Sequence, residues 1–451
     1  MVQWEKFYYT EAALAFDEAI RLDSNFAMAW ARRAFLDEAT RNHAKAMEDM
    51  AHALTLLRGG TPYEVMFIRL QNCRLTYANK QAADLADSML HLFSDEKEIY
   101  LIRGGLYELS KNFEGAIRSY ERAVEIDTSY ALAIMSLGYA YSTTGEQVKA
   151  VYQMERYIRL VPDAADPRAS YADILLRVGR YDEALDQYQK SLVLKPDYWY
   201  SANQIGLIYM TKGHLKAAGE HLHKGIAALP QSPQLKANHL TVDGHLNLLR
   251  GLYKEATLQY LDALSLDSTN AEAAYGLVNA FRKLKDFNRA GEVLRNIRVE
   301  LGHRNLLQSQ YMLSFYLAQS RLLLDEENSE LARASCDSAL EFATTLSRGP
   351  VFRQIAEIDL HDRRYEDAFD ACEEALRVNP NLPDPLFTLV KVYHAKGDDA
   401  MTKEIGDRLF EFWKGADPDF LSRIELQQFV RIKRNPSGGA SSVAMIATKL
   451  G

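Results

Sequence analysis

Across residues 131–162 the apolar positions recur at spacings of three and four residues, which is the period of an amphipathic helix. This run breaks at Gly145. A second apolar run extends from Val148 to Leu160 and stops before Pro162, which cannot continue a helix. The segment is therefore predicted to form two helices joined by a turn.

The same pattern returns every 34 residues. In the second predicted helix of four consecutive segments the recurring small residue is Ala116, Ala150, Ala184 and Ala218. In the first helix it is Gly104, Gly138, Ala172 and Gly206. Four residues beyond each alanine comes a large side chain: Tyr120, Met154, Tyr188 and Leu222. Small residues let paired helices cross closely, and the large ones are expected to fill the groove to the next pair.

With these motifs the chain resembles the tetratricopeptide repeat (TPR) family, whose 34-residue unit carries a W-x2-L-G-x2-Y…A-x3-F…P pattern. Here the pattern reads Leu137-Gly138…Tyr141…Ala150…Pro162. The alternative, an ankyrin array, needs a 33-residue unit with T-P-L-H-x-A, which is absent from the sequence. The resemblance implies an all-α, right-handed superhelical solenoid of about eleven helix-turn-helix units plus an N-terminal half unit.

The resemblance divides the chain into seven segments. They are a half unit with only its second helix (1–26), two N-terminal units of which the second is degenerate (27–96), four regular 34-residue units (97–232), two further units (233–303), three longer or degenerate units (304–416), a capping helix (417–434) and a flexible tail (435–451). Because the repeat spacing widens between Ala290 and Ala332, one extra helical turn per helix is expected around Leu306–Leu324 and Ser329–Leu346.

The predicted half unit leaves one side of its helix uncovered. Trp4, Phe7 and Tyr8, with parts of Leu14 and Ile20, are expected to face solvent, and a cluster of this kind usually marks an interface. We therefore expect an upstream domain or self-association at this end. A weaker resemblance, to bacterial TPR arrays that often trail a protein kinase, a nucleotide cyclase or a DNA-binding domain, agrees with an upstream domain.

Composition restricts the possible partners. With 53 Lys plus Arg against 61 Asp plus Glu, the net charge of −8 argues against a nucleic-acid-binding surface. No apolar run approaches the length of a membrane span, and the acidic residues near the start do not fit a secretory signal, so a cytoplasmic protein is expected. Cys73, Cys336 and Cys372 lie too far apart for a disulfide framework or zinc site and are expected to be buried.

Enzymatic motifs are absent from the sequence, which contains no G-x-G-x-x-G, G-x-x-x-x-G-K-[ST], H-E-x-x-H or G-x-S-x-G. His221 and His223 would point about 200° apart on a helix, so they cannot share a metal ion. His239 and His245 also fall on different faces. No catalytic residue, cofactor or metal ion is predicted.

Charged dipeptides have a structural interpretation. Adjacent carboxylates at predicted turns are expected to cap helices, as in Asp398-Asp399 and Glu326-Glu327. The adjacent arginines Arg363-Arg364 are expected to face solvent.

A clamp for the terminal carboxylate of a chaperone would need Lys, Asn and Arg on the first helices of three successive units, as the family resemblance implies. The matching places in the regular units hold Leu101, Ile102, Met135, Ser136, Ala169, Ser170, Asn203 and Gln204. No Lys or Arg stands among them, so this function is disfavoured.

The concave face remains as the predicted binding site. Among the inward positions of the regular first helices, the residues predicted to contact a peptide are Met135, Tyr139, Asp166, Asp173, Tyr200, Asn203, Leu207 and Met210. Aromatic residues and Met give adaptable contact, and polar groups fix the register of a peptide. Alternatively, residues such as Tyr139 pack between units. The predicted function is a non-catalytic scaffold for a protein or peptide partner; the alternative is a regulatory or sensor arm of a larger signalling protein.

Overall fold

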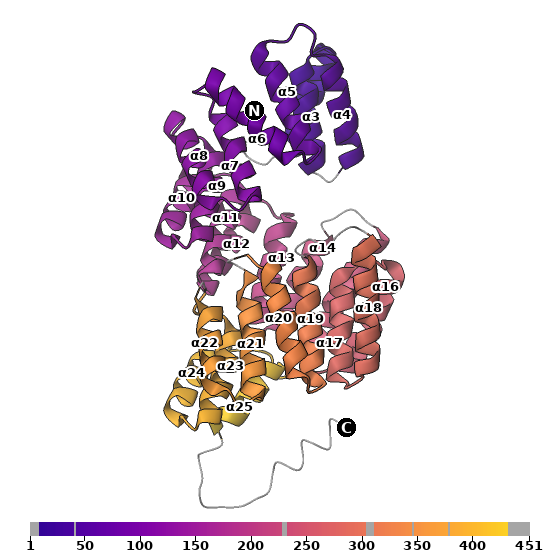
Figure 1. Ribbon diagram of the computed structural model, residues 1–451, viewed down its shortest axis with the longest axis vertical. Coiled ribbons are helices and arrows are strands. Elements are labelled where there is room, and N and C mark those ends of the chain that lie inside the picture. The colour runs from indigo at the N-terminus through magenta and orange to yellow at the C-terminus, as the bar shows by residue number, and fades with distance from the viewer. Residues whose placement is uncertain are drawn as a thin grey trace, which may run out of the picture. The chain divides into compact units, whose positions relative to one another are not determined.

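The computed structural model describes residues 9–39, 42–227, 232–303, 311–344, 347–377 and 379–431. Over these ranges it contains 24 α-helices and no β-strand, which confirms the predicted all-α class (Figure 1). The chain forms two compact units, residues 1–196 and 197–451, and each unit has its own hydrophobic clusters.

The first unit contains α2 (Tyr9–Leu22), α3 (Ala27–Ala39), α4 (His43–Thr55), α5 (Pro62–Leu75), α6 (Asn79–Leu92), α7 (Lys97–Leu109), α8 (Phe113–Ile126), α9 (Ala131–Thr144), α10 (Gln147–Leu160), α11 (Ala165–Arg177) and α12 (Tyr181–Leu194). The second unit contains α13 (Trp199–Thr211), α14 (Leu215–Ala227), α15 (Pro233–Leu249), α16 (Tyr253–Leu266), α17 (Ala271–Lys283), α18 (Phe287–His303), α19 (Tyr311–Asp325), α20 (Ser329–Phe342), α21 (Gly349–His361), α22 (Tyr365–Leu376), α23 (Pro383–Lys396), α24 (Asp399–Phe412) and α25 (Leu421–Arg431).

From α3 onward the helices pair in chain order, α3 with α4 through α23 with α24. The first helix of a pair also contacts the first helix of the next pair: α3 contacts α5, α9 contacts α11, and in the second unit α15, α17, α19, α21, α23 and α25 form a continuous row. We call the surface lined by these odd-numbered helices, from α3 on, the first-helix face. It is the counterpart of the predicted concave face.

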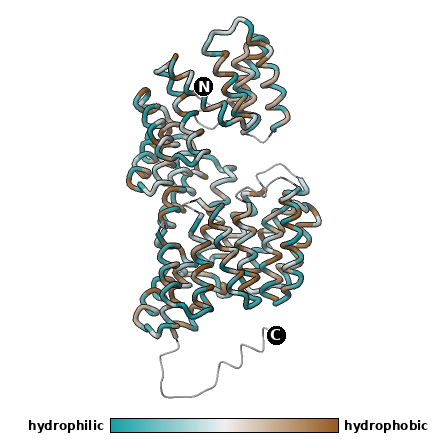
Figure 2. Tube along the Cα trace, in the orientation of Figure 1, coloured by the Kyte–Doolittle hydropathy of each residue, from teal (hydrophilic) through white to brown (hydrophobic). Residues whose placement is uncertain are grey.

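Small residues lie where the paired helices approach most closely, as the sequence predicts. A Cβ at Gly206 would lie 2.5 Å from Leu222 Cγ, so α13 and α14 could not pack as they do with a larger residue there. The large side chain therefore packs on the glycine of its own pair, and not solely in the groove to the next. Tyr260 does both, because it lies against Gly244 of its own pair and Gly276 of the next. Figure 2 shows the resulting alternation of hydrophobic and hydrophilic residues along the helices.

The observed helix lengths differ from the prediction of one extra turn in each helix of the widened repeat. Helix α20 has 14 residues and α19 has 15, whereas α15 and α18 have 17 each. The predicted extra turn around Ser329–Leu346 is therefore wrong, because α18 takes up the added turn before the widened pair begins. Residues 304–310, which include the start of the predicted Leu306–Leu324 helix, lie outside the described residues.

The second unit closes through contacts between segments that are 202 residues apart. The Trp413 Nε1–H donates to the Thr211 carbonyl at 3.1 Å, and the Asp417 N–H donates to the Gly213 carbonyl at 2.9 Å. Phe420 is buried in the same contact. The predicted capping helix 417–434 accordingly begins later, as α25 at Leu421, because the residues before it dock on the α13–α14 turn.

Several local predictions have mixed outcomes. Asp398 caps α24 through the Met401 N–H at 3.0 Å, as expected, whereas α20 is capped by Asn328 and not by Glu326-Glu327. Leu14 is 65% exposed, in agreement with the prediction for α2. Trp4, Phe7 and Tyr8, and the predicted tail 435–451, lie outside the described residues.

The cysteine prediction holds for two of the three residues. Cys336 and Cys372 are buried within the cluster of apolar side chains in the second unit, at the place that large side chains occupy in the regular pairs. Cys73 is only partly buried.

Candidate functional site

The two predicted carboxylates of the first unit accept hydrogen bonds from tyrosines on neighbouring helices. The Tyr139 hydroxyl of α9 donates to Asp173 Oδ2 of α11 at 2.7 Å, and the Tyr188 hydroxyl of α12 donates to the other oxygen of Asp173. The Tyr157 hydroxyl donates to Asp166 Oδ2 at 3.0 Å. Burial and the charge of Asp173 raise the pKa of Tyr139, which therefore stays a donor at neutral pH. These contacts join four successive helices, α9 to α12.

The remaining predicted residue of the first unit, Met135, lies beside Tyr139, half-buried against the hydrophobic cluster of α8–α11. Tyr139 also lies under the guanidinium of Arg177, 5.2 Å from its ring centre. The alternative interpretation, that Tyr139 packs between pairs, is therefore part of its role.

The other four predicted residues lie together on α13, in the second unit. Tyr200 accepts a hydrogen bond from Gln204 Nε2 at 3.0 Å. Asn203 is half-buried, Leu207 is 37% exposed, and Met210 packs against the cluster of apolar side chains in this unit. The eight predicted residues thus form two sets, one in each unit.

A cavity of about 490 Å³ opens on the first-helix face of the first unit, among α3, α5, α7 and α9. Its lining is mainly apolar: Phe16, Ala31, Phe35, Leu75, Leu101, Ile102, Gly105, Leu106, Leu109 and Leu132. This volume accommodates bulky side chains of a bound peptide. The cavity is not predictable from the sequence, because part of its wall belongs to the degenerate second unit of the segment 27–96.

Two arginines and two glutamates, Glu38 and Glu98, are the charged residues in the lining of this cavity. Arg32 of α3 forms a bidentate ion pair with Glu98 of α7, at 2.8 and 2.7 Å. Arg74 of α5 donates to Gln71 Oε1 at 2.7 Å and stacks on the Phe35 ring at 4.2 Å. Burial lowers the pKa of Arg74 to about 10, so it remains charged at neutral pH. Within the described part of the chain, Arg74 has no carboxylate at ion-pair distance.

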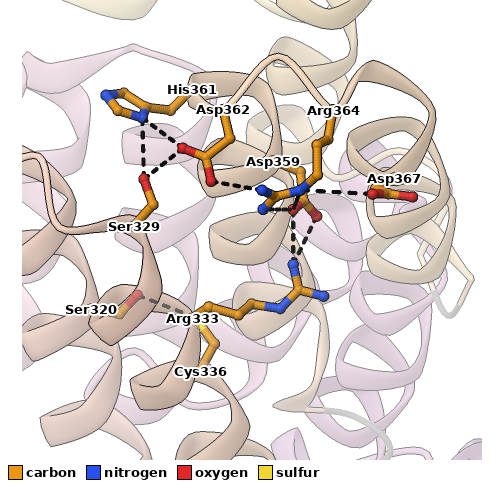
Figure 3. Close-up of polar contacts among 9 residues, drawn as sticks. All are labelled: Ser320, Ser329, Arg333, Cys336, Asp359, His361, Asp362, Arg364 and Asp367. Carbon is orange, nitrogen blue, oxygen red and sulfur yellow. Dashed lines mark hydrogen bonds and ion pairs between the residues drawn. The ribbon is translucent and has the colours of Figure 1, made fainter.

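A second polar cluster joins α20, α21 and the start of α22. Figure 3 shows Arg333 and Arg364 converging on Asp359. Asp359 is 1% exposed; Arg333 Nη1 donates to it at 2.9 Å and Arg364 Nη2 at 2.6 Å. The hydrogen bond to Asp359 raises the pKa of Arg364. Arg363 and Arg364 are both exposed, as expected, and Arg364 in addition binds this buried carboxylate and joins two helices.

Ser329, His361 and Asp362 meet beside this cluster, which invites comparison with a nucleophilic triad (Figure 3). Both contacts of His361 use the same nitrogen: Nδ1 lies 3.3 Å from Ser329 Oγ and 3.1 Å from Asp362 Oδ1. Ser329 donates directly to Asp362 at 2.6 Å. A triad needs the serine and the carboxylate on opposite ring nitrogens. This arrangement instead ties α20 to the end of α21.

The structure pairs histidines of two different helices, whereas the pairs considered from the sequence were His221 with His223 and His239 with His245. His223 Nδ1 of α14 lies 2.6 Å from His239 Nδ1 of α15, and His223 Nε2 lies 3.0 Å from Asp243 Oδ1. This contact joins two different helices, so the helical spacing of histidines within one helix does not predict it. No group of three or more His, Cys, Asp or Glu that could hold a metal ion occurs among the residues with described positions.

Across the helices described above, none is long and apolar enough to cross a membrane.

Comparison with known proteins identifies tetratricopeptide repeats. Two family models with that description match residues 97–130 and 171–233. Human tetratricopeptide repeat protein 13 is 27% identical over 190 residues, which are 40% of this chain and 20% of that protein. The match thus spans about a fifth of the length of this relative.

Solved structures with similar helical arrays include a tetratricopeptide repeat protein from Parabacteroides merdae (14% identity, TM-score 0.45, 55% of this chain and 93% of that one). The human IFIT1 dimer with m7Gppp-AAAA is another (15% identity, TM-score 0.46, 86% of this chain and 90% of that one).

Proposed function

The chain is a tetratricopeptide repeat protein, and we propose that it is a non-catalytic scaffold whose first-helix face binds an extended segment of a protein partner. Repeats of this family generally mediate protein binding. The observation that carries the proposal is the apolar cavity of about 490 Å³ among α3, α5, α7 and α9. Bulky side chains of the partner enter this cavity and are thereby removed from contact with water, which favours binding.

The predicted face residues extend this surface within each unit. In the first unit Met135 and Tyr139 offer apolar contact. Asp173 accepts a hydrogen bond from the Tyr139 hydroxyl and Asp166 accepts one from the Tyr157 hydroxyl, and these bonds hold the two tyrosines in position. In the second unit the contact residues are Tyr200, Asn203, Leu207 and Met210 on α13. The three free cysteines suit a reducing compartment such as the cytoplasm.

Gly105 allows the cavity to be blocked without disturbing the fold. It lies within α7 and lines the cavity, and the nearest atom to a Cβ placed there is the Tyr120 hydroxyl oxygen, at 3.9 Å. A leucine at this position therefore meets no close contact through its Cβ, and it extends into the space that a ligand would fill. Replacing a helical glycine also favours the helix by about 0.5–1 kcal/mol.

The experiment compares Gly105→Leu with Gly105→Ala. Peptides are first selected on the wild-type chain from a displayed random library, and their Kd values are then measured by fluorescence anisotropy. Because burying one large side chain is worth about 1.5–3 kcal/mol, Gly105→Leu is expected to raise Kd roughly tenfold or more, and Gly105→Ala to leave it nearly unchanged. Equal affinity of both variants for every selected peptide would remove the cavity from the binding site.

A further inference from the structure

Four cationic side chains lie close together in the second unit, one from each of the neighbouring helices α17, α19, α21 and α23. Figure 1 labels these four helices. They are Arg282, Arg321, Arg353 and Lys391. The whole chain carries a net charge of −8, so a cluster of four cations is a local reversal of its charge.

Three of the four cations have a carboxylate partner. Arg282 Nη2 lies 2.7 Å from Asp325 Oδ2. Lys391 Nζ lies 3.2 Å from Glu357 Oε1, and Arg353 Nη1 lies 3.9 Å from the same oxygen. Although burial alone would raise the pKa of Glu357, the charges of Lys391 and Arg353 hold it below its usual value, so this carboxylate stays ionised and is committed to them.

Arg321 is the exception. Among the described residues it makes no hydrogen bond and no ion pair, and its Nε is sealed from solvent without a partner. Burial, with the charges of Arg353 and Arg282, lowers the pKa of Arg321 to about 9, which leaves it protonated at neutral pH. The rest of its side chain is partly accessible. A buried charge without a partner costs stability unless a ligand supplies one.

The surroundings of Arg321 select the kind of ligand. A guanidinium matches a carboxylate through two parallel hydrogen bonds. The four cations face three carboxylates, Asp325, Glu357 and Asp384, so one positive charge is left uncompensated. One carboxylate neutralises it, whereas a chain of phosphates would be repelled by these three acids.

We propose that Arg321 anchors one acidic side chain, Asp or Glu, of a peptide segment bound along the first-helix face of the second unit. This inference rests on the proposed peptide-binding function, and it adds a site in the second unit with its own charge requirement. The row of first helices continues on both sides of α19, through α17 and α15 in one direction and α21 and α23 in the other. A peptide can therefore pass over Arg321 in both directions, which favours an internal side chain over a chain terminus.

A first test needs no ligand and compares Arg321→Met with Arg282→Met. Methionine keeps most of the apolar stem of an arginine. Arg321→Met removes an unpaired charge and its repulsion with two arginines, so it is expected to raise the thermal midpoint by about 2–4 °C. Arg282→Met leaves Asp325 without its partner and is expected to lower the midpoint. A drop for Arg321→Met as large as that for Arg282→Met would make Arg321 a structural residue and overturn the proposal.

The second test identifies the carboxylate. Amidated peptides selected on the wild-type chain are scanned with Glu→Gln and Asp→Asn replacements, and each is measured on wild type and on Arg321→Met. We expect one acidic position whose neutralisation weakens wild-type binding about tenfold or more and leaves binding to Arg321→Met unchanged. Equal losses on both proteins would overturn the proposal, as would dependence on a free C-terminus alone.

The two proposals fail in different ways. If peptides bind the wild-type chain but no acidic position depends on Arg321, the anchor is wrong and the scaffold function stands. If Gly105→Leu and Arg321→Met both leave every selected peptide bound as tightly as before, the first-helix face is not the binding surface, and both proposals fall together.

Discussion

The closure of the second unit can be tested with one methyl group, added at Gly213. This residue lies in the turn between α13 and α14 and has a φ of +77°. A Cβ there would lie 2.5 Å from Phe420 Cδ1 and 2.8 Å from Ala416 Cβ. Gly397, at the end of α23 in the same unit, has the same φ of +77°, but a Cβ there meets nothing within 4 Å. Gly213→Ala and Gly397→Ala therefore share the backbone cost and differ in the docked segment alone.

The expected magnitudes follow from these two contributions. A left-handed conformation costs an alanine about 1–2 kcal/mol, which applies to both variants. Overpacking a buried contact adds about 1–3 kcal/mol, which applies to Gly213→Ala alone. Phe420 cannot withdraw freely, because it is 3% exposed and packs edge-on against the buried Trp413 ring, 5.5 Å away. Gly213→Ala should therefore cost about 2–5 kcal/mol and Gly397→Ala about 1–2 kcal/mol.

Native-state hydrogen exchange read by mass spectrometry measures these costs locally, which matters because repeat arrays open segment by segment. In Gly213→Ala the amides of Leu421–Arg431 and of the α13–α14 turn should both lose protection. In Gly397→Ala the loss should stay near α23 and α24. If the two variants lose equal protection at Leu421–Arg431, the docking of residues 413–420 on α13–α14 does not stabilise the unit, and the reasoning fails.

Two further predictions concern titration and thiol chemistry. Burial lowers the pKa of both His239 and His245 below the unfolded value of about 6.5, so the unfolded chain binds protons first as the pH falls. The urea midpoint should therefore decrease between pH 7.5 and 5.5, less so in the double variant with Gln at both positions, and an unchanged midpoint would contradict this. Burial also raises the pKa of Cys336 to about 11 and of Cys372 to about 12. In the native protein a thiol reagent should therefore label Cys73 rapidly, and Cys336 and Cys372 only on unfolding. Fast labelling of all three cysteines would contradict this.

The fold was predictable because its determinants are local and repeated. A small residue every 34 positions, Gly or Ala, faces a large side chain 16 positions later, as in Gly206 and Leu222, and that spacing indicates two antiparallel helices in close contact. The cap at Asp398 follows from the same local chemistry. The helix that takes up the extra residues of the widened repeat was predicted wrongly. The sequence gives the distance between repeats, and it does not show which helix becomes longer.

Contacts that cross several repeats could not be predicted. The hydrogen bond from Trp413 to Thr211 depends on the curvature summed over all the intervening pairs, and no local pattern encodes that sum. The pairing of His223 with His239 needs the register of two helices across one turn. The cavity beside Arg74 was missed for a different reason: its wall includes a degenerate unit, where the repeat pattern is weakest.

The arginines show most clearly why the site needs the structure. Arg364 and Arg321 are both arginines near the surface of regular helices, and their sequence neighbourhoods do not separate their roles. Arg364 reaches a carboxylate that is 1% exposed and joins two helices, so removing it would take away one of the two arginines that neutralise this buried charge. Arg321 faces two other arginines and lacks a partner among the described residues, so removing it relieves repulsion. An arginine whose removal should stabilise the protein is held there against stability, and the proposed anchoring of an acidic side chain would explain such a cost.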